Sequence, residues 1–158
     1  MKKTFVSAVI AMLLLIVLAS TTFAAPAGRQ LLFKGSLLAV ETHVVTFPTF
    51  SLEATGSGKA TQLGLYEMSF QGEVFIPTLT ATETASLVGA DGSSIYADGV
   101  GQGTVTENPD FVSIVETYII TGGTGRFAGA TGSFTVARVN QRSSGVSSGT
   151  ISGIIVLP

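Results

Sequence analysis

Eight stretches of alternating apolar and polar residues, each bounded by turn-forming residues, restrict most strongly how this chain can fold. Alternation is the period of a half-buried β-strand, whose successive side chains point to opposite faces. It is clearest at 78–88, where Thr and Ser take one face and Leu and Ala most of the other. Turn signals such as Asp91-Gly92 and Asn108-Pro109-Asp110 separate the stretches. We predict strands at residues 31–45, 50–60, 63–75, 78–88, 93–106, 111–121, 133–141 and 147–157.

The connection at residues 121–132, Thr-Gly-Gly-Thr-Gly-Arg-Phe-Ala-Gly-Ala-Thr-Gly, lies between two of these strands. Glycine tolerates positive φ and close backbone approach, so we expect such positions at Gly123, Gly125, Gly129 and Gly132. The segment then joins two antiparallel strands. An even number of antiparallel strands joined in sequence can close on itself and leave no exposed edge. The predicted fold class is therefore all-β, an eight-stranded antiparallel barrel.

The first 25 residues have the composition of a secretory signal peptide. Lys2 and Lys3 precede an apolar core at 5–19, and the small residues that follow suit signal peptidase. The apolar core is shorter than the roughly 20 residues that a membrane helix requires. We therefore expect residues 26–158 to form a single β-barrel domain that is secreted, to the periplasm or the extracellular space, and has no membrane attachment after signal cleavage.

Composition narrows the partners and cofactors. Residues 26–158 hold six Lys and Arg against ten Asp and Glu, a formal charge of −4 that disfavours nucleic acid and anionic membranes as partners. The chain has no Cys and one His, which excludes a Cys/His zinc site and disulfides, and no run of Asp or Asn has the spacing of a calcium loop. We expect neither a metal nor an organic cofactor.

Two stretches match the letters of functional motifs, a nucleotide-binding fingerprint and a nucleophile elbow, but the secondary structure predicted around each differs from the one that its motif requires. Residues 123–128 fit the Gly-x-Gly-x-x-Ala nucleotide fingerprint, but that motif must open a helix, and strand sequence follows here. Residues 145–149, Gly-Val-Ser-Ser-Gly, fit the nucleophile elbow, which also requires a strand-to-helix turn and a His base. We interpret residues 145–149 as a plain loop. His43, near a strand end, is interpreted as a surface residue.

Strand parity places three charged residues on apolar faces, and these are the candidate catalytic residues: Glu83, Glu116 and Arg138. A carboxylate among apolar neighbours is costly unless it is paired, and an unpaired one has a raised pKa that suits a general acid or base. Glu116 and Arg138 are each 11 residues from Phe127 along the chain, on the strands before and after the connection. We therefore expect the two side chains to face each other across the hairpin. The alternatives are a purely structural ion pair or an outward position at a subunit contact. Ser69 and its neighbours of the same parity, Glu67, Gln71 and Glu73, should face solvent.

The connection at 121–132 resembles the turn Gly-Thr-Gly-x-Phe-x-x-Ala-x-Gly of the allene oxide cyclase and dirigent barrel superfamily, here spelled from Gly123 to Gly132. Residues 59–64 and 148–153 are similar to pieces of its small secreted bacterial members. The resemblance implies an eight-stranded barrel around an apolar cavity and a homo-oligomer, either a dimer or a trimer. It also implies one of two activities, folding of a reactive lipid by a cyclase or steering of radical coupling.

Two functions remain open from the sequence. The first is a barrel that binds a small hydrophobic molecule in its lumen and steers its cyclisation or coupling. Such a barrel, if it is an enzyme, is a cofactor-free cyclase or isomerase. The second is a non-catalytic structural or interaction barrel of the cell envelope or extracellular space. A cavity containing Glu83 or Glu116 would favour the first, and a filled core the second. Small residues expected inside are Ala81 and Ala85 and, if the odd-numbered face of the strand at 93–106 points inward, Ala97, Gly99, Gly101 and Gly103. The candidate ligand-binding residues are Ala81, Tyr118 and Phe134.

Overall fold

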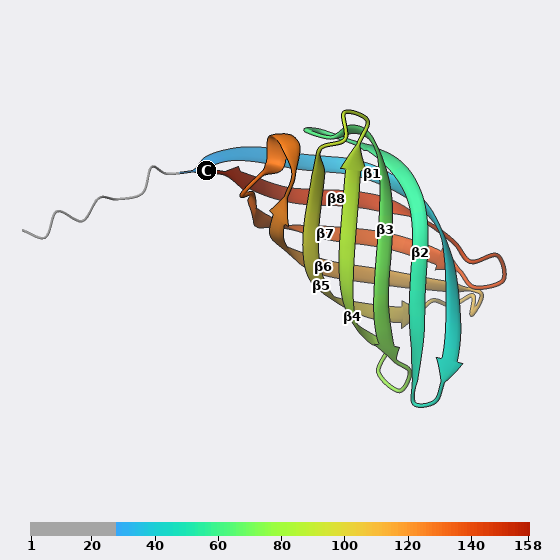
Figure 1. Cartoon of the computed structure of the whole chain (residues 1–158). Helices are drawn as coiled ribbons and strands as arrows, with labels where there is room; N and C mark the ends of the chain where they lie inside the picture. Colours follow the sequence, from blue (N-terminus) through green and yellow to red (C-terminus); the bar gives the residue numbers. More distant parts are fainter. Residues whose placement is uncertain (1–27) are drawn as a thin grey trace, which may run out of the picture.

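The computed structural model describes residues 28–158, which form a closed antiparallel β-barrel (Figure 1). The predicted signal peptide lies outside the described residues. Every strand pairs with the next along the chain, and the last strand closes the sheet against the first. The strands are β1 (Arg29–Thr46), β2 (Thr49–Ala60), β3 (Gly64–Phe75), β4 (Thr80–Gly89), β5 (Ser94–Val105), β6 (Phe111–Gly123), β7 (Thr131–Gln141) and β8 (Val146–Leu157).

All eight predicted strands are present, with their ends within two residues of the prediction. The alternation of side chains decides which face of each strand is inside. On β3, for example, Tyr66, Met68 and Phe70 are buried, whereas Glu67 and Ser69 between them are exposed. Gln71 and Glu73 are exposed as well, so the predicted solvent-facing row is confirmed. Within residues 28–158, no helix has the length and apolarity needed to cross a bilayer.

The connection between β6 and β7 contains a single 3₁₀ turn, η1 (Gly125–Phe127), that lays Phe127 over one end of the barrel. Gly125 has φ +57°, and a Cβ on Gly123 would lie 2.4 Å from the Ser94 carbonyl oxygen, so both positions require glycine as predicted. The turn has three residues and leads directly into β7. It therefore lacks the helix that a nucleotide fingerprint requires, which confirms the rejection of that motif.

The half of the barrel nearest η1 is filled by side chains. Tyr118 stacks on Phe134 with ring centroids 5.0 Å apart, and Phe134 meets Phe33 edge-on at 5.5 Å. Phe70 also packs against Tyr118, with ring centroids 5.8 Å apart. Leu, Ile and Val residues from the surrounding strands complete this core. An interior of eight strands is just wide enough for side chains to fill it, and here they do so over one half only.

The other half of the barrel is open. A cavity of about 940 Å³ lies there, at the end where β1 turns into β2, β3 into β4, β5 into β6 and β7 into β8. Its walls include Leu52, Val74 and Ile114. The small residues Gly101 and Gly103 of β5 also line it, as predicted, and add no side-chain volume. The barrel thus has a packed end and a hollow end.

Candidate functional site

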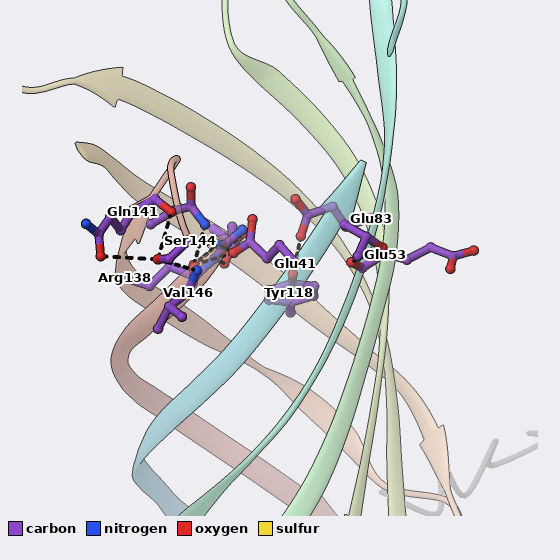
Figure 2. A network of polar contacts seen from close by, with 12 residues as sticks. Glu41, Glu53, Glu83, Tyr118, Arg138, Gln141, Ser144 and Val146 are labelled. Atoms are coloured by element: carbon purple, nitrogen blue, oxygen red, sulfur yellow. Dashed lines mark hydrogen bonds and ion pairs between the residues drawn. The ribbon is translucent and has the colours of Figure 1, made fainter. Parts of the chain in front are cut away.

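Polar side chains form a layer between the packed and the hollow halves (Figure 2). Its central contact is the ion pair between Glu116 of β6 and Arg138 of β7, both almost fully buried. Arg138 Nε donates to Glu116 Oε1 at 2.9 Å and to Oε2 at 3.1 Å, and Nη2 donates to Oε1 at 2.6 Å. The expected pair is therefore confirmed, and it faces inward. The two residues are diagonal neighbours, because Arg138 is directly opposite Ile114 in the register.

Arg138 also contacts groups that the sequence interpretation did not include. Its Nη1 donates to Ser147 Oγ at 2.7 Å and to a Glu41 carboxylate oxygen. The Ser147 hydroxyl donates to Glu41, and Asn140 Nδ2 donates to Ser147 at 3.3 Å. Interpreting residues 145–149 as a plain loop was wrong in part: β8 begins at Val146, and its pairing with β7 carries Ser147 into the barrel.

Glu83 of β4 and Tyr118 of β6 form the second contact of the layer. The Tyr118 hydroxyl donates a hydrogen bond to Glu83 Oε2, which Figure 2 shows as a dashed line, and both side chains are buried. β5 lies between their strands, and Gly99 is its residue in register with both. A Cβ at Gly99 would lie 2.4 Å from the Tyr118 ring. Glycine at this position therefore lets the two side chains meet across an intervening strand.

The same device recurs around the layer. Four long polar side chains of the layer lie in register with a glycine on a neighbouring strand, and at each of these glycines a Cβ would come within 3.0 Å of one of these four side chains. In the hydrogen-bonded register the pairs are Glu83 with Gly72 and Gly99, Tyr118 with Gly99, Glu116 with Gly101, and Arg138 with Gly149.

Burial and mutual charge set the protonation of the layer. Burial, followed by the charge of Glu116, raises the pKa of Glu83 to about 7, although the Tyr118 hydrogen bond and the charge of Arg138 oppose the shift. Burial and the two carboxylates raise the pKa of Tyr118, which keeps its proton. Burial lowers the pKa of Arg138, but the hydrogen bond and charge of Glu116 outweigh it and raise the pKa overall. Glu83 can therefore exchange a proton near neutral pH.

The polar layer forms the floor of the cavity, where Glu41, Glu83 and Arg138 are exposed to its interior. Of the candidate ligand-binding residues, Ala81 lines the wall. Tyr118 lies beneath the floor and reaches it through Glu83, and Phe134 packs behind Tyr118 in the filled half. Asp110, Arg142 and His43 surround the mouth, and His43 is exposed, as expected, with its ring centroid 5.5 Å from that of Phe50.

Proton transfer and hydrogen bonding are the chemistry that these groups supply. Glu83 can accept or donate a proton at the cavity floor, while the Glu116–Arg138 pair provides fixed charge behind it. Across residues 28–158, no three His, Asp or Glu side chains are grouped so as to hold a metal ion.

The architecture is similar to that of the pterocarpan synthase dirigent protein. The two structures align with a TM-score of 0.55 and 11% sequence identity, over 89% of this chain and 96% of that one. This chain has a dirigent-like barrel fold. The alignment thus supports the fold implied by the 121–132 connection, at an identity that shows fold alone. No protein-family model and no curated protein matches the sequence.

Proposed function

We propose that this protein binds a small hydrophobic molecule in the hollow half of its barrel and orients it against the polar floor. The observation that carries the proposal is the cavity of about 940 Å³, apolar along its walls and ending at Glu83. Ligand sites of roughly 300–1,000 Å³ typically combine apolar walls with a few convergent polar groups. A core filled throughout by side chains, as the structural alternative expects, would leave no such space.

The walls would supply affinity and the floor would supply orientation. Burying apolar ligand surface against Leu52, Val74 and Ile114 contributes roughly 25 cal/mol per Å², before the costs of association and ordering. Glu83 can then hold one polar end of the molecule. Because Tyr118 fixes Glu83 from the packed side, the carboxyl group is held in one position before the ligand arrives.

We further propose that binding steers a cyclisation or coupling of the ligand, with Glu83 as the group that moves a proton. The raised pKa of Glu83 supports this role, because a general acid or base works best when its pKa lies near the ambient pH. The likeness to a protein described as a pterocarpan synthase also supports it. The activity would be that of a cofactor-free cyclase or isomerase, in a secreted homo-oligomer.

A titration with the neutral fluorescent probe N-phenyl-1-naphthylamine tests the binding proposal. We expect saturable binding that a metal chelator does not change. Ala81→Phe, which fills the cavity, should weaken binding by about tenfold or more, a change of about 1.4 kcal/mol. The matched control is Thr82→Phe, which adds the same side chain on the outer face of β4. Absence of saturable binding, or equal binding by both variants, would contradict the proposal.

The second candidate function is an interaction barrel, and one feature of the outer surface favours it. The outward-facing residues of β6, β7 and β8 include no charged side chain. Three adjacent strands therefore present a face of Thr, Ser, Val and Ile, which suits contact with another protein surface. A failed probe titration would leave this candidate as the better account.

A further inference from the structure

The cavity floor carries more negative than positive charge. The floor contains three carboxyl groups, those of Glu41, Glu83 and Glu116, and one guanidinium group, that of Arg138. The charged groups at the mouth, Asp110 and Arg142, cancel each other in this count. A proton on Glu83 still leaves Glu41 and Glu116 against Arg138. The floor therefore has a net negative charge in either state of Glu83.

Arg138 is already engaged, so it does not neutralise Glu83. Its Nε and Nη2 donate to Glu116, and its Nη1 donates to Glu41 and Ser147. None of these hydrogen bonds reaches Glu83, whose contact in Figure 2 is the one with Tyr118. The charge of Arg138 lowers the pKa of Glu83, but less than burial and Glu116 raise it. Glu83 is thus a buried carboxyl group without a cationic partner of its own.

One oxygen of Glu83 is free to meet a ligand. Oε2 accepts the hydrogen bond from Tyr118, and the hydrogen bonds between described residues include none donated to Oε1. Because no enclosed side-chain oxygen of the described residues lacks a partner, Oε1 is not enclosed and is reached from the cavity that Glu83 lines. Oε1 lies over Gly101, 3.6 Å from where a Cβ would stand, and both Glu83 and Gly101 line the cavity. A carboxylate oxygen that faces a cavity takes its hydrogen-bond donor from whatever occupies the cavity, and a cationic donor gives the stronger hydrogen bond.

We propose that the cavity takes a hydrophobic amine, whose ammonium group donates to Glu83 Oε1 while its apolar body packs against Leu52, Val74 and Ile114. This inference rests on the proposed function and adds the ligand's chemical class. A cation at this position satisfies the open oxygen and offsets the net negative charge of the floor. A ligand carboxylate would instead add a fourth negative group to the floor and be rejected.

The raised pKa of Glu83 agrees with this assignment. Burial and the nearby charge of Glu116 make the carboxyl group hold a proton up to about pH 7. An ammonium group in that place would stabilise the carboxylate and lower its pKa. Amine binding near pH 6 should therefore release most of one proton per site, because Glu83 is then mostly protonated in the free protein.

Three compounds of similar shape test the ligand class by displacing N-phenyl-1-naphthylamine. They are 1-(aminomethyl)naphthalene, which is a cation, 1-naphthalenemethanol, which is neutral, and 1-naphthoate, which is an anion. We expect the amine to bind about tenfold tighter than the alcohol or better, and the anion to bind most weakly. Glu83→Gln should abolish this preference. Glu73→Gln, an exposed carboxylate of β3, is the control and should retain it.

A calorimetric measurement on the unmodified protein makes the test independent of how the variant folds. Titration of the amine near pH 6 in two buffers with different ionisation enthalpies should show proton release, and titration of the alcohol should show none. Probe binding without an amine preference and without proton release would overturn the amine assignment while leaving the proposed function intact. A probe that does not bind at all would overturn both.

Discussion

Replacing Arg138 with methionine is expected to destabilise the barrel more than replacing Glu116 with glutamine. Arg138→Met leaves two carboxylates, Glu116 and Glu41, without a cation inside the protein. Breaking a buried pair by removing one partner costs roughly 3–5 kcal/mol. Glu116→Gln leaves Arg138 paired with Glu41 and bonded to Ser147, so its cost should be about 1–3 kcal/mol.

The double variant Arg138→Met/Glu116→Gln should be more stable than Arg138→Met alone, because it no longer buries the Glu116 charge. In a double-mutant cycle this appears as a coupling energy of at least about 1 kcal/mol. For a domain of this size, the loss in Arg138→Met corresponds to a Tm lower by roughly 10–20 °C.

Urea unfolding near pH 7, followed by far-ultraviolet circular dichroism, gives the free energy of each variant. The slope against urea should stay constant across the set, since a changed slope would mean that the folded or unfolded state itself had changed. Zero coupling, or an Arg138→Met variant as stable as the unmodified protein, would refute the account of a charged layer held by Arg138.

Three further predictions concern positions around the layer and the η1 connection. Gly125→Val should lower stability by roughly 1–3 kcal/mol, because φ is +57° and a Cβ would lie 2.5 Å from Ser93 Oγ; an unchanged melting temperature would count against the turn geometry. Gly99→Ala should lower stability by roughly 1–3 kcal/mol, because its Cβ would collide with the Tyr118 ring. Urea unfolding that shows no loss of stability would mean that Tyr118 of β6 does not lie over Gly99 of β5. Stability should fall by about 3 kcal/mol as pH rises from about 4.5 to 7, because the folded state holds a proton on Glu83 that the unfolded state has lost. Urea unfolding across that range should show a smaller fall in Glu83→Gln, and identical pH profiles would remove Glu83 as the group responsible.

Strand parity was sufficient to predict three of the inward charged residues, those on β4, β6 and β7. Glu83, Glu116 and Arg138 all lie on strands whose other face is mostly polar or solvent-exposed. The alternation on these strands therefore allows only one choice of inward face. In a closed barrel every strand has an inner face, and a charged residue with inward parity must enter the lumen. The contact between Glu116 and Arg138 follows because their strands are adjacent in the chain and in the sheet.

Glu41 was missed because the sequence of its strand does not show which face points inward. β1 carries Leu37 and Ala39 inside but Leu38 and Val40 outside, so apolar residues occupy both faces. Parity alone then leaves open which face enters the lumen. The closure of β8 onto β1 decides it, and that pairing joins the two ends of the chain.

The contact between Glu83 and Tyr118 depends on the register of three strands, which local sequence does not determine. The hollow half also depends on register, since it lies where small residues of β4 and β5, Ala81 and Gly101, are paired. A usable signal was nonetheless present in the sequence. The alternate glycines Gly99, Gly101 and Gly103 of β5 point inward, where they make room for long side chains and for the cavity.

A crystal structure of the protein with N-phenyl-1-naphthylamine would test the central claim most directly. The account predicts the probe in the hollow half of the barrel, in contact with Ala81 and Ile114 and ending at Glu83, with the packed half unchanged. A probe bound only on the outer face of the sheet, or a lumen filled by collapsed side chains, would contradict it.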